Sequence, residues 1–361
     1  MQMPALRKPL LGLAVFAALL CGLFFLALEI APMGKLRAVL KGRRFYSLAF
    51  SPDSKLVAAG EHDGNLTIWE TANGAEWFTL PADRMADFDF SAAIVAFAFS
   101  PDGTTLAWGE GDRTVTIFDL QTKQVTKRFP PYETRIVGLS FTSKPTVLAT
   151  VTRGGLIRLL DLDTDESWVA FDAMKSRYYN PIVGSVVIGR ACMDARGKTL
   201  ALGLGGDLVF LDVSQRRQER EIAHAESWGG LGALDLSADG NKLAVGGPDV
   251  VSFFDSGTGG QLGTIPVKQG AAEGCVRYLA FSPDGRMLAL GLTRGEHLAS
   301  DLSVWDLDEK LEISRFACHA GPLSQIAWSP DGKTIATASD ELGRSSVKLW
   351  NVASILKSRR K

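Results

Sequence analysis

A four-residue turn motif recurs along the chain at a nearly constant interval, and this repeat constrains the fold more than any other feature. Its full form, Ser-Pro-Asp followed by Ser or Gly, begins at residues 51, 100, 282 and 329. Weaker copies begin at residues 142, 194 and 237, so successive copies lie 42 to 52 residues apart. A length of 361 residues alone would suggest two ordinary domains, whereas seven repeats of about 45 residues indicate a single repetitive body.

Each repeat carries the same pattern of four short strands. In the first repeat an alternating strand, 46–50, leads into the turn and a second strand follows at 55–59. A third strand ends at Trp69 and a fourth covers 76–80. Four antiparallel strands cannot bury both faces alone, but seven such units in a ring cover each other. The sequence therefore predicts an all-β fold, a seven-bladed β-propeller of four-stranded blades.

The third strand of each repeat ends with an aromatic residue or Leu before a polar residue. These endings are Trp69-Glu70, Phe118-Asp119, Leu160-Asp161, Leu211-Asp212, Phe254-Asp255, Trp305-Asp306 and Trp350-Asn351. Together with the turn motif they resemble the WD-repeat β-propeller family over roughly residues 35–361. A periplasmic class of propellers shares the turn but usually lacks the Trp-Asp ending, so the WD-repeat resemblance is preferred.

The resemblance implies residues that lock the blades. The family carries a His before the first strand and an Asp six residues ahead of the Trp, in a buried hydrogen-bond network. His319 matches the first position, and Asp63 and Asp112 match the second. With Trp69, Trp305 and Trp350 they are expected to lock blades, not to catalyse. Most repeats depart from this pattern, and the Asp position elsewhere holds Gly154, Gly205, Pro248, Ala299 or Arg344.

An uncharged segment precedes the repeats. Leu10 to Leu28 contains 19 residues, which as a helix would span about 28 Å, close to the hydrocarbon thickness of a bilayer. A cleaved signal peptide is the alternative, but the segment is longer than a usual signal core and no good cleavage site follows it. The sequence predicts a retained single-pass transmembrane helix, with anchor and linker in residues 1–34 and the propeller in 35–361.

The last repeat lacks a convincing fourth strand of its own. Residues 35–40 resemble the fourth strands of other repeats, so they are expected to complete the seventh blade. Six residues, 29–34, would then join helix and ring over at most about 20 Å. This arrangement predicts that the face carrying the Ser-Pro-Asp turns lies toward the bilayer. The basic tail, Lys357, Arg359, Arg360 and Lys361, would leave on that face and could contact anionic lipids, or be a solvated terminus.

Charge and cysteine content exclude some classes of protein. The chain has 39 basic and 40 acidic residues, which gives no field to hold a nucleic acid. Four cysteines are too few for a disulfide scaffold. Basic residues flank both ends of residues 10–28, so the side of the membrane stays open. An odd number of cysteines outside that segment favours a reducing, cytoplasmic location for the propeller.

No motif in the chain indicates an enzyme. Phosphate loops, HExxH, CxxC and nucleophile elbows are absent from the sequence, and its four histidines fall in four different repeats. We therefore expect no catalytic residue, metal or cofactor. The predicted function is a membrane-tethered scaffold for a protein or peptide partner. The alternative is a propeller enzyme or small-ligand receptor that uses the axial channel, which requires converging polar groups at the axis.

The loops between repeats supply the candidate partner surface, on the face away from the membrane. Exposed aromatic and Arg side chains are typical anchors of interfaces. The candidates are Arg177, Tyr178, Tyr179, Trp228, Arg294 and His297. The competing interpretation is that Tyr178 and Trp228 fold inward and close the entrance to the ring.

Overall fold

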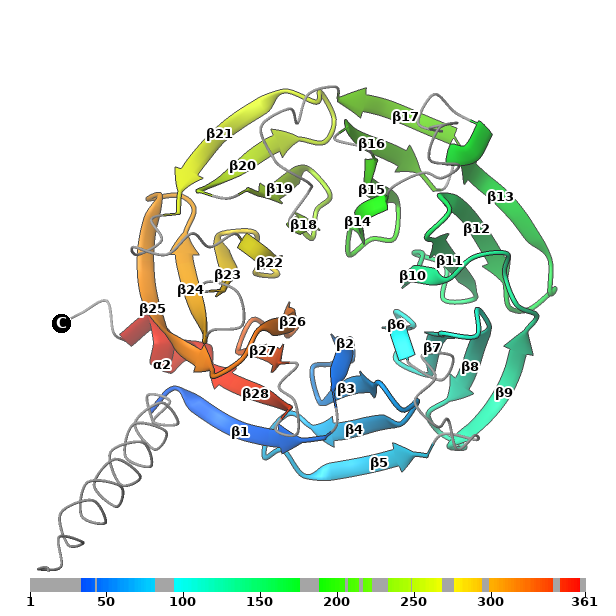
Figure 1. Cartoon of the computed structure of the whole chain (residues 1–361), viewed down its shortest axis with the longest axis horizontal. Helices are drawn as coiled ribbons and strands as arrows, with labels where there is room; N and C mark the ends of the chain where they lie inside the picture. Colours follow the sequence, from blue (N-terminus) through cyan, green and yellow to red (C-terminus); the bar gives the residue numbers. More distant parts are fainter. Residues whose placement is uncertain are drawn as a thin grey trace, which may run out of the picture.

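Seven four-stranded antiparallel sheets form a closed ring in a computed structural model of the chain (Figure 1). The structure describes residues 34–42, 44–81, 94–175, 188–204, 207–213, 217–222, 233–247, 249–267, 276–293, 299–339 and 345–357. The predicted all-β, seven-bladed propeller of four-stranded blades is confirmed. We number the blades from one to seven in chain order, starting with β2 (Phe45–Phe50).

Each blade contributes one strand to each of four concentric positions. The inner strands are β2, β6 (Ile94–Phe99), β10 (Ile136–Phe141), β14 (Ile188–Met193), β18 (Ala233–Leu236), β22 (Val276–Phe281) and β26 (Leu323–Trp328). The second strands are β3 (Leu56–Glu61), β7 (Thr105–Glu110), β11 (Val147–Thr152), β15 (Thr199–Leu204), β19 (Lys242–Gly246), β23 (Met287–Thr293) and β27 (Thr334–Ser339).

The third and outer strands complete the blades. The third strands are β4 (Leu66–Glu70), β8 (Val115–Asp119), β12 (Leu156–Asp161), β16 (Asp207–Asp212), β20 (Val250–Asp255), β24 (Ser300–Asp306) and β28 (Ser346–Asn351). The outer strands are β5 (Glu76–Leu80), β9 (Gln124–Phe129), β13 (Ser167–Asp172), β17 (Arg217–Ile222), β21 (Gln261–Pro266), β25 (Leu311–His319) and β1 (Leu36–Lys41). A short 3₁₀ helix, η1 (Ala173–Lys175), follows β13, and α2 (Val352–Leu356) follows β28.

The antiparallel order gives the ring two different faces. The turn face carries the turns from inner to second strands, such as 51–54, and the turns from third to outer strands. The loop face carries the turns from second to third strands and the ends of the outer strands. Because strand direction alternates, each blade passes to the next at the loop face.

The Ser-Pro-Asp motif forms a hydrogen-bonded turn at the end of each inner strand that has it. In blade one Ser51 Oγ donates to Asp53 Oδ1 at 2.7 Å and accepts the backbone N–H of Leu56 at 2.9 Å. Asp53 also accepts the N–H of Lys55 at 3.0 Å. The same bonds form in the turns that begin at residues 100, 237, 282 and 329.

The fourth turn position has a left-handed backbone, which explains why most repeats place Gly there. Gly103 has φ of 71° and Gly332 has φ of 70°. Blade one has Ser54 instead, at φ of 61°. Its hydroxyl accepts the backbone N–H of Asp331 from blade seven at 2.9 Å. The strained residue therefore joins the first blade to the last.

The hydrophobic core lies between neighbouring blades. One cluster joins blades seven and one, with Leu40, Val347 and Leu349 packed with Phe45 and Trp69. The rings of Phe45 and Trp69 meet edge to face at 6.0 Å. Each blade thus buries its two faces against the blades on either side, which is why the ring must close.

The first and the last described strands meet in blade seven. Strand β1 pairs antiparallel with β28, with Leu36 opposite Trp350 and Leu40 opposite Val347. Figure 1 shows β1 beside β28, with α2 next to β25. Lys35 Nζ donates to Ser314 Oγ of blade six at 2.7 Å, so the start of β1 also bonds to the preceding blade.

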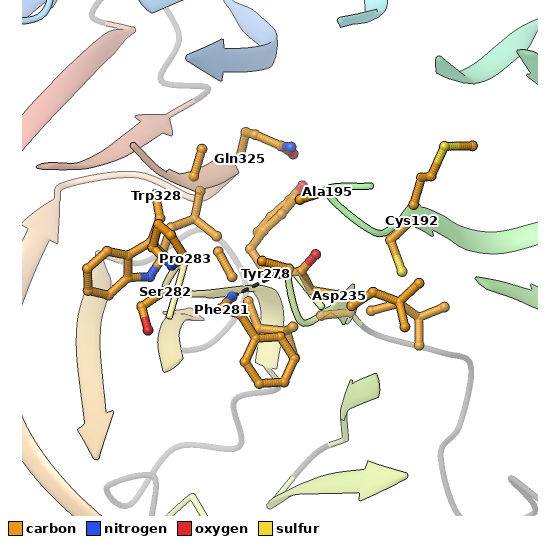
Figure 2. Close-up of a pocket in the computed structure, with 18 of the residues that line it drawn as sticks. Cys192, Ala195, Asp235, Tyr278, Phe281, Ser282, Pro283, Gln325 and Trp328 are labelled. Atoms are coloured by element: carbon orange, nitrogen blue, oxygen red, sulfur yellow. Dashed lines mark hydrogen bonds between the residues drawn. The ribbon is translucent and has the colours of Figure 1, made fainter. Parts of the chain in front are cut away.

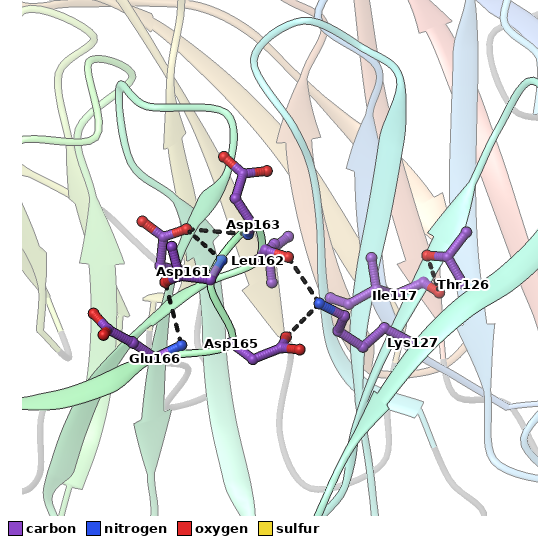
Figure 3. Close-up of polar contacts among 9 residues, drawn as sticks. Ile117, Thr126, Lys127, Asp161, Leu162, Asp163, Asp165 and Glu166 are labelled. Carbon is purple, nitrogen blue, oxygen red and sulfur yellow. Dashed lines mark hydrogen bonds and ion pairs between the residues drawn. The ribbon is translucent and has the colours of Figure 1, made fainter.

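Polar contacts at the rim supplement the apolar core. Lys127 on β9 of blade two donates to the carbonyl oxygen of Leu162 in blade three at 2.8 Å and pairs with the Asp165 carboxylate (Figure 3). The acceptors lie in the turn that follows β12. This contact joins two blades at the edge of the turn face.

The predicted transmembrane helix at residues 10–28 lies outside the described residues. Within the described part of the chain, no helix combines the length and apolar character needed to cross a membrane.

Candidate functional site

An axial pocket of about 540 Å³ lies among the inner strands of blades four to seven (Figure 2). Strands β14, β18, β22 and β26 line it, and the turns after them extend the lining to the turn face. Most of the lining is apolar. Its side chains capable of polar interaction or ionisation include Cys192, Asp235, Arg277, Tyr278, Ser282, Gln325 and Trp328.

The residue two places before each turn occupies an equivalent position in every blade. In six blades this residue is small and uncharged: Ala49, Ala98, Ser140, Cys192, Ala280 and Ala327. Blade five has Asp235 at this position. The blade architecture therefore does not require an acid there, and Asp235 distinguishes one side of the axis from the rest.

Asp235 is held at the pocket by the neighbouring blade. Its Oδ2 accepts the backbone N–H of Phe281 at 2.8 Å, and the carboxyl group is half-buried. Burial raises the pKa of Asp235 to about 7, although the hydrogen bonds from Phe281 and Leu236 act in the opposite direction. This carboxyl group therefore changes charge near neutral pH.

Two neighbouring groups define the chemistry around Asp235. Burial raises the pKa of the Cys192 thiol, and the negative charge of Asp235 raises it further, so Cys192 is not an activated nucleophile. Trp328 is 8% exposed, and its indole N–H has no hydrogen-bond partner among the described residues. The pocket thus contains one carboxyl group, and the thiol beside it is not activated.

The described lining contains few ionisable side chains. Asp235 is its one carboxyl group and no histidine contributes to it. Across the described part of the chain no three His, Cys, Asp or Glu side chains are grouped to hold a metal ion. The described arrangement can bind and orient a ligand, but it provides no acid–base pair.

His319, the last residue of β25 in blade six, takes part in a buried network with two residues of blade seven. Its Nε2 lies 2.8 Å from Thr337 Oγ1, which also accepts the indole N–H of Trp350 at 2.9 Å. Burial lowers the pKa of His319 to about 3, so the ring is neutral in the folded protein. Its Nδ1 is buried without a partner in the described residues. Arg344 stands where the resemblance expects an acid.

Blade three contains a similar pair that the sequence analysis missed. Thr150 Oγ1 donates to Tyr132 Oη at 3.0 Å, and Tyr132 is 8% exposed. Tyr132 precedes Phe141 by nine residues, as His319 precedes Trp328. That shared spacing was the available signal.

The other candidate locking residues have different local roles. The Trp305 indole donates to Ser303 Oγ at 2.9 Å, and Ser303 in turn donates to Glu312 at 2.6 Å. Asp112 accepts the N–H and hydroxyl of Thr114 within its own turn, at 3.0 and 2.7 Å. Asp63 accepts the N–H of Asn65 in the corresponding turn at 3.4 Å. Both acids are half-buried.

The candidate partner residues cannot be placed from the structure. Arg177, Tyr178, Tyr179, Trp228, Arg294 and His297 all lie outside the described residues. In the basic tail, Lys357 is exposed at the end of α2, whereas Arg359, Arg360 and Lys361 lie outside the described part.

Comparison with known proteins adds to the geometry. The family described as "WD domain, G-beta repeat" matches residues 34–70 and 310–351, which include the strands of the closing blade. These two segments carry WD40 repeats. The propeller is similar to the β-propeller domain of Cps50 (Swd1) from Myceliophteria thermophila, with a TM-score of 0.71 over 88% of this chain and 98% of that one. At 17% identity, this likeness shows the fold alone.

Curated relatives match short parts of the WD40 propeller. Mouse apoptotic protease-activating factor 1 is 26% identical over 122 residues, which is 34% of this chain and 9% of the relative. The COMPASS component SWD1 of Saccharomyces cerevisiae is 37% identical over 79 residues, or 21% of this chain and 17% of the relative. The matches thus span less than a fifth of each of these relatives.

Proposed function

We propose that this WD40 propeller is a non-catalytic scaffold that presents a surface to a protein or peptide partner and is held at a membrane by residues 10–28. The observation that carries the scaffold proposal is the closed ring of WD40 repeats with no metal-binding cluster in its described residues. One similar protein is described as a component of an assembly, COMPASS. A rigid ring with variable loops suits binding, because a stable framework holds exposed side chains in place.

The position of β1 supports an orientation for the tether. Leu36, the first residue of β1, pairs with Trp350 near the turn that precedes Thr334, so the chain enters β1 at the turn face. Six residues, 29–34, lie between the end of the apolar segment at Leu28 and Lys35. An extended linker of that length spans at most about 20 Å. The proposal therefore sets the turn face toward the bilayer and the loop face away from it.

The proposed partner surface is the loop face. Strand β13 ends at this face and β14 begins there, and residues 176–187 join them in sequence. Residues 223–232 join β17 to β18 in the same way. Tyr178 and Trp228 belong to these two connections. Large aromatic side chains at such positions are typical energetic anchors of a protein interface.

The basic tail and the cysteines extend the proposal. Helix α2 follows the end of β28 at the turn face, and Lys357 at its end is exposed. With Arg359, Arg360 and Lys361 it would contact anionic lipids, each contributing about 1 kcal/mol near an anionic leaflet. Cys192 and Cys318 are both free thiols in the structure, which suits a cytoplasmic propeller.

Affinity capture tests the partner surface. The full-length chain and a Tyr178→Ala/Trp228→Ala double variant are expected to recover different sets of proteins, with specific partners reduced at least tenfold on the variant. A Val125→Ala/Val169→Ala variant changes two exposed side chains of the outer strands and is the matched control. An unchanged set on the Tyr178/Trp228 variant would remove this surface from the proposal.

A second candidate function is a small-ligand receptor, and the axial pocket favours it. The observation is Asp235 at a position where the other blades place a small uncharged residue. This candidate is independent of the partner surface, because the pocket lies on the ring axis near the turn face.

A further inference from the structure

The repeat does not require an acid at position 235 in order to form its strands and turns. Ala occupies the equivalent position in blades one, two, six and seven, and those blades form the same strands and turns. A half-buried carboxylate costs free energy when it is ionised, because water is partly removed from it. Because Asp235 is not needed for the fold and is unfavourable there when ionised, we expect it to serve the binding of a ligand.

The Asp235 carboxylate has no ionic partner in the described structure. Its hydrogen bonds come from the neutral backbone N–H groups of Phe281 and Leu236, and no described Lys or Arg side chain pairs with it. Arg277 also lines the pocket but has contacts of its own. Arg277 lies five residues before the turn that begins at residue 282, whereas Asp235 lies two residues before the turn that begins at residue 237. This difference of three strand residues separates the two positions by about 10 Å along the strand direction.

The rest of the lining suits an organic group rather than a hydrated ion. Leu234, Ala280 and Pro283 supply apolar surface, and the aromatic rings of Tyr278 and Trp328 line the same cavity (Figure 2). Aromatic faces attract ammonium and guanidinium groups. A volume of about 540 Å³ lies within the range of small-molecule sites.

We propose that the axial pocket binds an organic cation, an ammonium or guanidinium group on a short apolar stem, with Asp235 as its counter-ion. A free cation and a cationic side chain of a peptide present the same chemistry to the carboxylate, and the test below distinguishes the two. The proposal rests on the small-ligand candidate and not on the partner surface, so either can fail alone.

Binding at this site is expected to depend on pH. The other titratable groups of the lining are Cys192 on β14 and Arg277 and Tyr278 on β22, while β26 contributes the uncharged Gln325. Asp194, the residue after β14, is buried, and its Oδ1 accepts the backbone N–H groups of Lys198 and Thr199 in its own turn. With a pKa of about 7, Asp235 is about one-tenth ionised at pH 6 and nine-tenths at pH 8. A cation that requires the ionised form therefore binds about tenfold more tightly at pH 8.

Calorimetric titration of the full-length chain in detergent tests the site with butylguanidinium. Its neutral isostere, butylurea, controls for apolar binding. The wild type is expected to bind the guanidinium with about tenfold higher affinity at pH 8 than at pH 6, and to bind the urea at least tenfold more weakly. Asp235→Asn and Asp235→Ala are expected to lose at least tenfold in affinity at pH 8 and to show no pH dependence.

Matched variants keep the test interpretable. Asp235→Ala is expected to fold, because Ala stands at this position in four blades, and its unfolding temperature verifies this. Asp308→Asn removes an exposed acid of the turn face and should leave binding unchanged. Equal binding by Asp235→Asn and wild type, equal binding of urea and guanidinium, or pH-independent binding would each overturn the proposal. Nα-Acetyl-lysine methylamide, tested alongside free butylamine, separates a peptide-borne cation from a free one.

Discussion

Single polar side chains distinguish one blade from another in this ring. Thr337 accepts from Trp350 and contacts His319, and Thr150 makes the related bond to Tyr132. The same position of the second strand is apolar in the other blades: Ala59, Trp108, Leu202, Val245 and Leu290. The hydrogen-bonded pair is therefore a local addition to a blade that also forms without it, as Asp235 is at the axis.

Thr337→Val should be one of the more costly single substitutions in blade seven. It keeps the side-chain shape but leaves the Trp350 indole and His319 Nε2 buried with one partner fewer. Leaving buried polar groups unpaired costs about 2–3 kcal/mol in total. Urea unfolding of the two chains measures the difference.

Thr150→Val is the matched control for that measurement. It removes one hydroxyl that bonds a single side chain, Tyr132, so its expected cost is about 1 kcal/mol. If Thr337→Val were no more destabilising than Thr150→Val, the network of His319, Thr337 and Trp350 between blades six and seven would contribute nothing beyond an ordinary hydrogen bond.

At the scale of elements, the outer strand β1 has the most distinctive role. It is first in sequence and completes the last blade, pairing with β28 from Leu36 to Lys41. Alternation of its side chains sets its energetics, because Leu40 is 2% exposed against Val347 and Leu349 while Val39 is 44% exposed. The contact of Lys127 with Leu162 at the rim shows that polar bonds supplement such apolar packing between blades.

Leu40→Ala should destabilise the whole ring, since the core that it contacts is shared by blades seven and one. The expected cost is about 2–4 kcal/mol, typical of a large-to-small change in a packed core. Val39→Ala, one residue away on the exposed side of the strand, should change stability by less than about 0.5 kcal/mol. Thermal unfolding followed by circular dichroism compares the two, and similar losses would mean that β1 does not depend on its buried face.

The described residues form a ring whose closure brings the first and last described segments, β1 and α2, to blade seven at the turn face. This arrangement connects the propeller to the proposed anchor without a long linker, because residues 29–34 directly precede the closing strand. In this proposal the tether would leave the loop face free for a partner.

Replacing Leu19 and Leu23 with Arg is expected to move the chain from the membrane pellet to the soluble fraction. Each Arg costs about 2.5–3.5 kcal/mol near the centre of a spanning helix. The unfolding temperature of the ring should not change. Protease protection of the wild type in sealed vesicles would identify the side that carries the propeller. If the wild type were itself soluble without detergent, the tether would be ruled out.

The sequence predicted the repeat, the blade number and the strand count, because these follow from local turn chemistry. The hydrogen bonds of a Ser-Pro-Asp-Gly turn form between residues of that turn, so each turn could be predicted from its own local sequence. Tyr132 and Asp235 were missed because their roles depend on a partner from another strand or blade. Thr150 faces Tyr132 only after β11 has folded against its blade, and Phe281 meets Asp235 only across the blade boundary.

Sequence alone determined that this chain forms a ring of seven four-stranded blades. The repeat period sets the number of blades, and the apolar alternation gives each blade faces that only neighbouring blades can bury. Only the tertiary structure decided which inner-strand positions share the axis. Ring closure brings blades four to seven around one pocket. Closure depends on the rotation from each blade to the next, added up over all the blades. The role of Asp235 at the pocket therefore depends on residues more than forty positions away in the sequence, such as Phe281.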